Sequence, residues 1–292
     1  MGQNLNPSVY ILILNWKTPQ QTITCLENIH KLNYENFNVI IIDNGSNDES
    51  EEILKKKFPE HEFVQTGKNL GYAAGNNAGI RRAVAAGGEF IWILNPDVRV
   101  TPNSLKAMLN VMTIEPNVGI CGPRIVQTSA PAERLIDGYS LKANGRFSIS
   151  PNLVTRQTPL SPHDVDYVIG CSMLVRTKAF EEIGLFCEDF FLYWEETELC
   201  LRAQRGGWRV VVVPEAVNFH DSPLHWAAAN ERHHIKSSII FSRIQRRFLV
   251  QTTVHHIKSM LKNNYLKEGM PALFEGLFDS LKQIPNLESK KI

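Results

Sequence analysis

Short apolar runs alternate with stretches of helical apolar spacing along the first third of the chain. The runs Val9–Leu14, Phe37–Ile42 and Phe90–Leu94 are too short for buried helices and rich in β-branched residues, which predicts strands buried on both faces. Between the first two runs, apolar residues such as Ile23 and Leu26 recur at helical spacing. Because strand, helix and strand follow one another, we predict an α/β fold with a mixed, mainly parallel sheet flanked by helices.

Composition is that of an ordinary globular protein, and the 292 residues allow one large α/β domain or two smaller ones. The net charge of +1 gives no general signal for nucleic-acid binding. The five cysteines are scattered and odd in number, so we expect no disulfide framework and a reduced, cytoplasmic setting. No basic signal-peptide region precedes the first apolar run, and no run approaches the ~20 residues of a membrane span.

Acidic residues and one histidine follow the predicted strands or open a helix. Asp43 follows the second apolar run, and Asp97 follows the third behind a proline that must end the strand. His220 ends a later strand, and Glu195 and Glu196 open a helix. Any one of these carboxylates would more often be a turn former, but several at the edge where α/β sheets bind ligands favour a site. Oxygen ligands with at most one imidazole favour Mg²⁺ or Mn²⁺ over zinc.

Glu195 and Glu196 have two interpretations. They could cap their helix and pair with Arg202 or Arg205. Alternatively, burial between aromatic residues and the helix, together with their mutual repulsion, would raise a carboxyl pKa toward the value of a general base at neutral pH. His220 is as consistent with a structural role as with metal or phosphate contact.

A glycine-rich stretch from Asn69 to Gly79 opens another predicted helix. It matches neither the dinucleotide fingerprint nor a P-loop. It could be a tight turn before an alanine-rich helix, or its free backbone N–H groups could form a wall of an anion pocket.

The second half of the chain contains two stretches of different character. From 127 to 163 the regular pattern disappears, which predicts a long, partly ordered connection. From residue 231 onward, eleven Lys and Arg stand against five Asp and Glu, and apolar residues recur at helical spacing from Ile235 to Leu249. This predicts a basic amphipathic extension, either with a solvated basic face or attached to a membrane surface. We expect a catalytic domain over 1–225 and a helical extension over 226–292.

Five segments in order resemble the family 2 glycosyltransferases of GT-A, Rossmann-like fold, in particular their rhamnosyltransferase-like branch. The resemblance runs from about residue 8 to 222, and its ordered set is far more specific than any one motif. The segments are Asn15-Trp16-Lys17, Ile42–Asp48, Asn69–Ile80, Asn95-Pro96-Asp97 and Phe190–Leu199.

The resemblance implies roles for single residues. Asp43 would bind the nucleotide base. Asp97 would bind the divalent metal, which would be Mg²⁺ or Mn²⁺, and His220 would contact the metal or the diphosphate. Glu196 stands where the family has its aspartate base, so the role stays with Glu196 or passes to Glu195. Further nucleotide-sugar contacts would come from Asn15, Asn44, Asn69, Gly71, Asn76 and Asn95. Since Asn95 replaces the first acid of an Asp-x-Asp motif, metal affinity should depend on bound donor.

The resemblance thus predicts an inverting, metal-assisted glycosyltransferase of cell-envelope polysaccharide assembly. The donor would be a dTDP- or UDP-sugar, with rhamnose as the leading choice, and the acceptor a glycan or lipid-linked sugar. The segment 127–163 and the C-terminal helices would shape the acceptor side, and the helices could contact the inner face of the plasma membrane. One alternative is a non-catalytic sugar-nucleotide-binding scaffold. A nucleotidyltransferase would need a basic, glycine-rich loop after the first strand, which Asn15–Pro19 does not supply.

Overall fold

The computed structural model describes residues 6–128, 133–220, 228–263 and 266–281. Their strands and helices follow the chain in this order: β1 Val9–Asn15, α1 Pro19–Ile29, β2 Phe37–Asp43, α2 Ser50–Lys57, β3 Glu62–Gln65, α3 Gly71–Ala85, β4 Phe90–Leu94, β5 Val98–Val100, α4 Ser104–Ile114, β6 Val118–Gln127, β7 Arg134–Ala143, β8 Phe147–Val154, β9 His163–Asp164, β10 Ser172–Arg176, α5 Thr177–Ile183, α6 Glu195–Arg205, β11 Arg209–His220, α7 Ala228–Ile244, α8 Leu249–Asn263 and α9 Leu266–Leu281.

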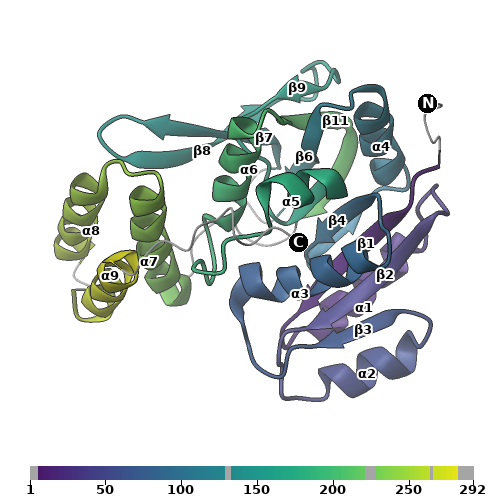
Figure 1. Cartoon of the computed structure of the whole chain (residues 1–292), viewed down its shortest axis with the longest axis horizontal. Helices are drawn as coiled ribbons and strands as arrows, with labels where there is room; N and C mark the ends of the chain where they lie inside the picture. The colour runs from purple at the N-terminus through teal and green to yellow at the C-terminus, as the bar shows by residue number, and fades with distance from the viewer. Residues whose placement is uncertain (1–5, 129–132, 221–227, 264–265, 282–292) are drawn as a thin grey trace.

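One mixed sheet forms the centre of the molecule, with helices packed around it (Figure 1). Its strand order is β3-β2-β1-β4-β10-β6-β11-β5. Strands β1 to β4 run parallel, as their apolar runs predict, whereas β10 is antiparallel to both β4 and β6. All five residues of β4 are buried. The predicted mixed, mainly parallel α/β sheet with a helical C-terminal part is therefore confirmed.

The stretch 127–163 is not the irregular connection that its pattern predicts. Strands β7 and β8 form an antiparallel hairpin that pairs with β6 at the side of the sheet. The side chains of Arg124 and Asp137, from β6 and β7, form a buried bidentate ion pair with both distances at 2.6 Å. The sequence pattern does not reveal the hairpin for two reasons. Most residues of β8 are only half-buried, and the pairing register shifts beside Gly138, which has a φ of +68°.

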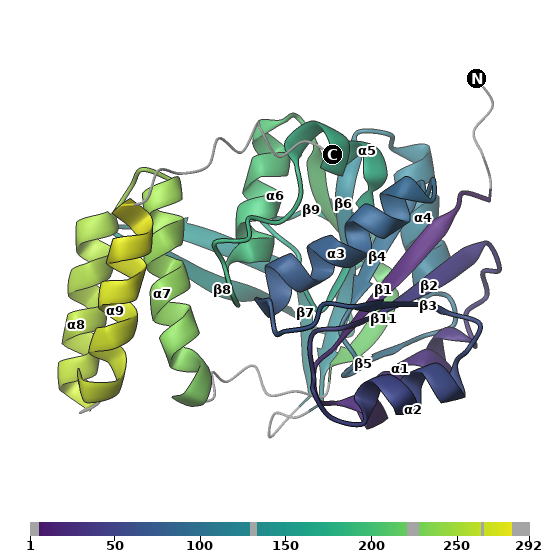
Figure 2. The ribbon, with the colours of Figure 1, turned by 60° about the horizontal axis from the view of Figure 1, so that its bottom comes forward.

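Helices α7 to α9 form a separate layer at one end of the molecule, beside the β7–β8 hairpin (Figures 1 and 2). The apolar face of α7 is buried within the protein: Ile235 and Ile239 pack against α8 and α9. The helix ends at Ile244 instead of continuing to Leu249, because Arg246 and Phe248 adopt positive φ. None of the described helices is both long enough and apolar enough to cross a membrane.

Helix α7 also contacts the loop that leads into α6. The rings of Trp194 and Phe241 lie 4.7 Å apart, and the Ser237 hydroxyl donates to the Leu192 carbonyl at 2.9 Å. The indole N–H of Trp194 donates to Nδ1 of His234 at 3.2 Å. The C-terminal helices therefore support the loop that precedes Glu195 and Glu196.

Candidate active site

Asp97 and His220 come together as the sequence predicts. Asp97 lies in the turn between β4 and β5, and His220 is the last residue of β11. Because β11 runs antiparallel to β5, His220 pairs with Val98, directly beside Asp97. Oδ2 of Asp97 lies 3.4 Å from Nε2 of His220, and the histidine is buried to 8% exposure. Its Nδ1 atom is buried without a hydrogen-bond partner among the described residues.

Glu195 and Glu196 begin helix α6, as predicted, behind an unusual backbone. The preceding residues Tyr193 and Trp194 both have left-handed φ values, 72° and 73°. Such conformations are costly for aromatic residues and are found where a site fixes them. The strained turn directs the chain from the aromatic loop into the helix, and so sets the position of both carboxyl groups.

The two carboxyl groups differ in environment. Glu195 is buried, and burial followed by the charge of Glu196 raises its pKa well above the usual value. Glu196 is only partly buried, and burial raises its pKa to about 7, although backbone N–H groups of Glu196, Thr197 and Gly170 oppose the shift. Oε2 of each residue is buried and lacks a hydrogen-bond partner in the described part of the chain. Near neutral pH, Glu196 can therefore accept a proton.

The turn at Gly170 and Cys171 joins the two pairs into one site. The Asn95 backbone N–H donates to the Cys171 carbonyl at 2.9 Å, and Tyr72 donates its hydroxyl proton to the Gly170 carbonyl at 2.7 Å. Burial raises the pKa of the Cys171 thiol, and the negative charges of Asp97 and Glu196 raise it further. A Cβ atom on Gly170 would lie 3.6 Å from the Glu196 Cβ, and Asn95, two residues before Asp97, is bonded to Cys171, so both carboxylates lie near this turn. The sequence interpretation missed Tyr72 and Cys171, and aromatic and thiol side chains beside a glycine give no pattern that would identify them.

Asp43 is held at the end of β2 by a dense set of donors. Its carboxylate accepts hydrogen bonds from the Asn15 amide at 2.7 Å, the Ser46 backbone N–H at 3.0 Å and the Gln65 amide at 2.9 Å. The Ser46 hydroxyl also donates to it. Asp43, Asn15 and Ser46 are buried, whereas Gln65 is exposed. Sequence reasoning did not include Gln65, which ends the short strand β3.

The asparagines of the glycine-rich stretch mainly hold the backbone. The Asn44 side chain donates to Asn69 Oδ1 at 3.0 Å and to the Gly71 carbonyl at 3.1 Å, and the Gly71 N–H donates to Asn69 Oδ1 at 2.9 Å. Asn76 is buried and donates to the Tyr72 carbonyl of its own helix. A Cβ atom on Gly71 would lie 2.4 Å from the Phe191 carbonyl oxygen, so only glycine fits where α3 meets the aromatic loop.

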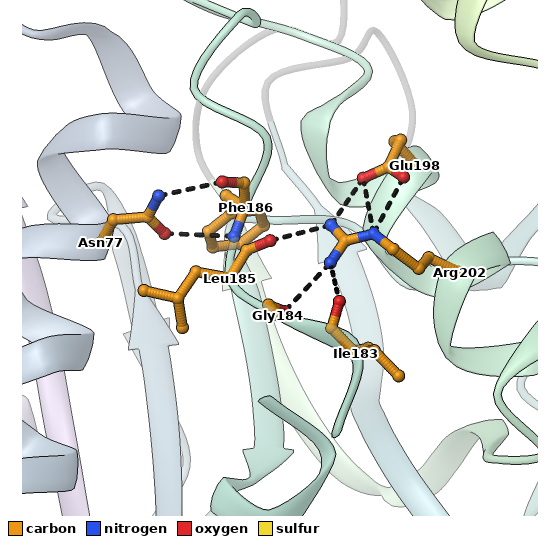
Figure 3. A network of polar contacts seen from close by, with 7 residues as sticks. All are labelled: Asn77, Ile183, Gly184, Leu185, Phe186, Glu198 and Arg202. Carbon is orange, nitrogen blue, oxygen red and sulfur yellow. Dashed lines mark hydrogen bonds and ion pairs between the residues drawn. The ribbon is translucent and has the colours of Figure 1, made fainter. Parts of the chain in front are cut away.

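A second network fixes helices α6 and α3 to the segment at the end of α5 (Figure 3). Arg202 pairs with Glu198 at 2.6 Å and donates to the backbone carbonyls of Ile183, Gly184 and Leu185. Asn77 of α3 exchanges two hydrogen bonds with the Phe186 backbone. The predicted alternative in which Arg202 pairs with Glu195 or Glu196 is not found, because Glu198 takes that place.

The donor set at Asp97 and His220 fits a hard divalent cation in part. One carboxylate and one imidazole leave most of an octahedral shell to other ligands. Mg²⁺ commonly completes such a shell with waters and substrate phosphates. Asn95 is half-buried beside this pair, with its backbone fixed to Cys171. The residues present therefore suit Mg²⁺ or Mn²⁺ that binds together with a diphosphate.

Comparison with known proteins identifies the family and the fold. Residues 8–184 match the model of glycosyl transferase family 2. An N-acetylglucosaminyl-diphospho-decaprenol L-rhamnosyltransferase of Mycobacterium tuberculosis is 32% identical over 230 residues, which cover 70% of this chain and 73% of the relative. A dTDP-rhamnosyl transferase of Shigella flexneri is 28% identical, over 74% of this chain and 70% of the relative. A mannosyltransferase from Pyrobaculum calidifontis, solved with GDP-Man and Mn²⁺, shares the fold with a TM-score of 0.58 at 14% identity, over 96% of this chain and 76% of that chain.

The family match covers more than half of the chain and includes Asn15, Asp43, Asn69 and Asp97. The matched region also contains the parallel strands β1 to β4, and Asn15 and Asp43 are the last residues of β1 and β2. The chain therefore belongs to glycosyl transferase family 2.

Proposed function

We propose that this glycosyltransferase inverts the anomeric configuration as it moves a sugar from a nucleoside-diphosphate donor to an acceptor hydroxyl. The leading donor is dTDP-rhamnose, supported by the two rhamnosyltransferase relatives, and UDP-sugars are the next choice. The observation that carries the proposal is the position of Glu196 and of the Asp97–His220 pair near one turn, at Gly170 and Cys171.

The chemistry assigns one task to each group. Glu196 takes the proton of the acceptor hydroxyl while that oxygen bonds to the anomeric carbon. The bond from the anomeric carbon to the diphosphate breaks on the opposite face, and its electron pair leaves with the diphosphate. Asp97 and His220 would hold Mg²⁺ or Mn²⁺, which supplies neutralisation of the departing charge when bound. Burial and the charge of Glu196 raise the pKa of the more deeply buried Glu195 well above its usual value, which favours its neutral form and reduces charge repulsion with Glu196.

The nucleotide base would bind at Asp43. Among the residues that donate to this carboxylate, Gln65 is the exposed one. A base N–H group would take the position of the Gln65 amide. Asn15 and Ser46 are buried, and the Ser46 hydroxyl also accepts a hydrogen bond from the Lys17 backbone N–H. Asn44, Asn69, Gly71 and Asn76 would act on the donor by fixing this wall of the pocket.

For the acceptor, a lipid-linked sugar is the leading choice. The M. tuberculosis relative is named for a diphospho-decaprenol acceptor. In this chain, helix α8 exposes Val250, Val254 and Leu261, and helix α9 exposes Phe274 and Phe278. At helical spacing the three α8 residues fall on one face, and so do the two phenylalanines.

We infer that these two apolar stripes touch the surface of an anionic membrane, with the protein on its cytoplasmic side. Exposed Lys258 and Lys262 flank the α8 stripe, and Glu275 and Asp279 on α9 are neutralised by ion pairs with Arg232 and Lys236. Basic residues beside exposed apolar ones are typical of interfacial helices. The layer of α7 to α9 would thus bring the loop before Glu195 close to a lipid-linked acceptor (Figure 2).

Vesicle sedimentation tests the membrane contact. The wild-type protein should sediment with vesicles that contain anionic lipid and less with neutral ones. Phe274→Ser together with Phe278→Ser should weaken sedimentation, because the stripe on α9 is lost while that on α8 remains. Ile114→Ser, at an exposed isoleucine on α4, is the matched control and should leave it unchanged. Equal sedimentation of the phenylalanine variant and the control would refute the contact.

A thermal-shift screen of nucleotide-sugars with and without Mn²⁺ tests the function. A donor that binds only the native state raises the melting temperature by mass action. We expect the largest rise with dTDP-rhamnose and Mn²⁺ together, followed by measurable donor turnover. Binding without any turnover would favour the non-catalytic scaffold, and the absence of a shift with every nucleotide-sugar would contradict both.

A further inference from the structure

A cluster of potential metal ligands lies outside the catalytic edge of the sheet. His30 follows the last residue of α1, and Glu60 and His61 lie in the loop between α2 and β3. One ligand atom from each of the three residues lies within 4.8 Å of the other two. Neither the family match nor the catalytic site gives these residues a task.

His61 is held so that one nitrogen points into this cluster. Its side chain is 10% exposed, and its ring stacks on Phe58, with ring centroids 5.9 Å apart and planes at 12°. The His30 ring lies 5.3 Å from it. Nε2 of His61 is buried without a hydrogen-bond partner among the described residues, and it lies 3.7 Å from Glu60 Oε1, beyond hydrogen-bond range. A buried nitrogen that lacks a partner here indicates a missing ligand.

The chemistry of the three groups selects the class of metal. Two imidazoles and one carboxylate suit Zn²⁺ and similar transition metals, in contrast to the hard-cation set at Asp97. Zinc–ligand bonds of about 2.0–2.2 Å in a tetrahedron place ligand atoms about 3.4 Å apart. His30 and Glu60 are exposed and can rotate to close the difference, whereas His61 is already fixed by Phe58.

We propose that His30, Glu60 and His61 bind one Zn²⁺ or similar divalent transition-metal ion, with a fourth position open to water. The ion would link the end of α1 to the loop before β3. Helix α1 connects β1 to β2, and the loop leads into β3. These three strands carry Asn15, Asp43 and Gln65. Since the three ligands come together only in the folded chain, bound Zn²⁺ would raise the stability of this part of the sheet without taking part in sugar transfer.

Competition against a chromophoric zinc chelator provides the test. The wild-type chain should withdraw one equivalent of Zn²⁺, and His30→Ala and Glu60→Gln should weaken that binding at least tenfold. Both residues are exposed, so these variants keep the fold even if His61→Ala does not. His163→Ala, at a histidine of β9, is the matched control and should bind as the wild type does. The five cysteines are buried and do not compete.

Two further readouts separate this site from the catalytic one. Zn²⁺ should raise the melting temperature of the wild type and of Asp97→Ala alike, but not that of His30→Ala. Donor turnover in Mn²⁺ should be the same in His30→Ala and in the wild type. Unchanged zinc affinity in both His30→Ala and Glu60→Gln, or loss of the zinc-dependent melting shift in Asp97→Ala, would overturn the proposal.

Discussion

Nε2 of His220 lies 3.4 Å from Oδ2 of Asp97, although one residue ends the last strand of the sheet and the other follows β4. The antiparallel pairing of β11 with β5 brings them together. Among the described residues that we assign to the site, only this pair combines a carboxylate with an imidazole. Its chemistry is therefore the first to be tested.

Removal of the carboxylate at Asp97 should abolish metal-dependent transfer. We expect Asp97→Ala to lower kcat by roughly 10²–10³-fold, because a preorganised charge at the departing diphosphate is lost. His220→Ala should lower it less, since diphosphate oxygens and water can replace one imidazole. Initial rates measured across a Mn²⁺ titration check both variants, and full activity of Asp97→Ala would contradict the assignment.

The pH dependence should identify the base. Glu196 acts only when deprotonated, and burial raises its pKa in the free protein to about 7, so kcat/KM should increase with pH through about 7 and then level off. Glu196→Gln should lose about 10²–10⁴-fold in kcat and this pH dependence with it. Glu195→Gln should keep the pH dependence. If Glu195→Gln is the variant that loses it, the base is Glu195.

Glu196 should also reduce the stability of the folded protein above neutral pH. Its pKa is raised from 4.5 to about 7. Below about pH 4.5 this residue therefore does not lower the free energy of unfolding, and this free energy decreases as pH rises from there through about 7. Glu196→Gln should therefore be more stable than the wild type at pH 8, by at most about 3 kcal/mol, and nearly equal to it at pH 4.5. Urea unfolding at both pH values measures the difference; an equal effect at both would refute the raised pKa.

Arg202 should matter for stability more than for chemistry. Arg202→Ala leaves Glu198 buried and removes donors from three carbonyls, which should cost about 3–5 kcal/mol of unfolding free energy. Arg202→Lys should recover little, because an ammonium group cannot reproduce the fork of the guanidinium. Arg205→Ala, on the same helix but exposed, is the control and should change stability by less than about 0.5 kcal/mol. Denaturant titrations compare the three variants.

The sequence predicts the parallel half of the molecule well because its strands are buried on both faces. Val9–Leu14 and Phe90–Leu94 stand out as apolar runs, and the polar residues that follow them meet at one edge. The β7–β8 hairpin gives no such signal, since it is half-exposed and irregular in register. Local patterns also do not reveal the buried Arg124–Asp137 pair, which depends on contacts between two strands.

Within the site, pattern and motif order indicated which residues gather but not how each acts. Asn69 Oδ1 accepts hydrogen bonds from the Asn44 side chain and the Gly71 backbone, and Asn76 donates to the Tyr72 carbonyl, contacts that the sequence did not reveal. Their contact with the donor stays a prediction. The left-handed turn at Tyr193 and Trp194 has no sequence signature, because aromatic residues rarely adopt it. The break between α7 and α8 was missed for the same reason, at Arg246 and Phe248.

The stereochemistry of slow donor hydrolysis tests the central claim most directly, because water then replaces the unidentified acceptor. Proton NMR of the sugar first released, before mutarotation, reports its anomeric configuration. We predict a configuration opposite to that of the donor, with Mn²⁺-dependent release that Glu196→Gln abolishes. A released sugar with retained configuration, or an unchanged rate in Glu196→Gln, would contradict an inverting transfer with Glu196 as its base.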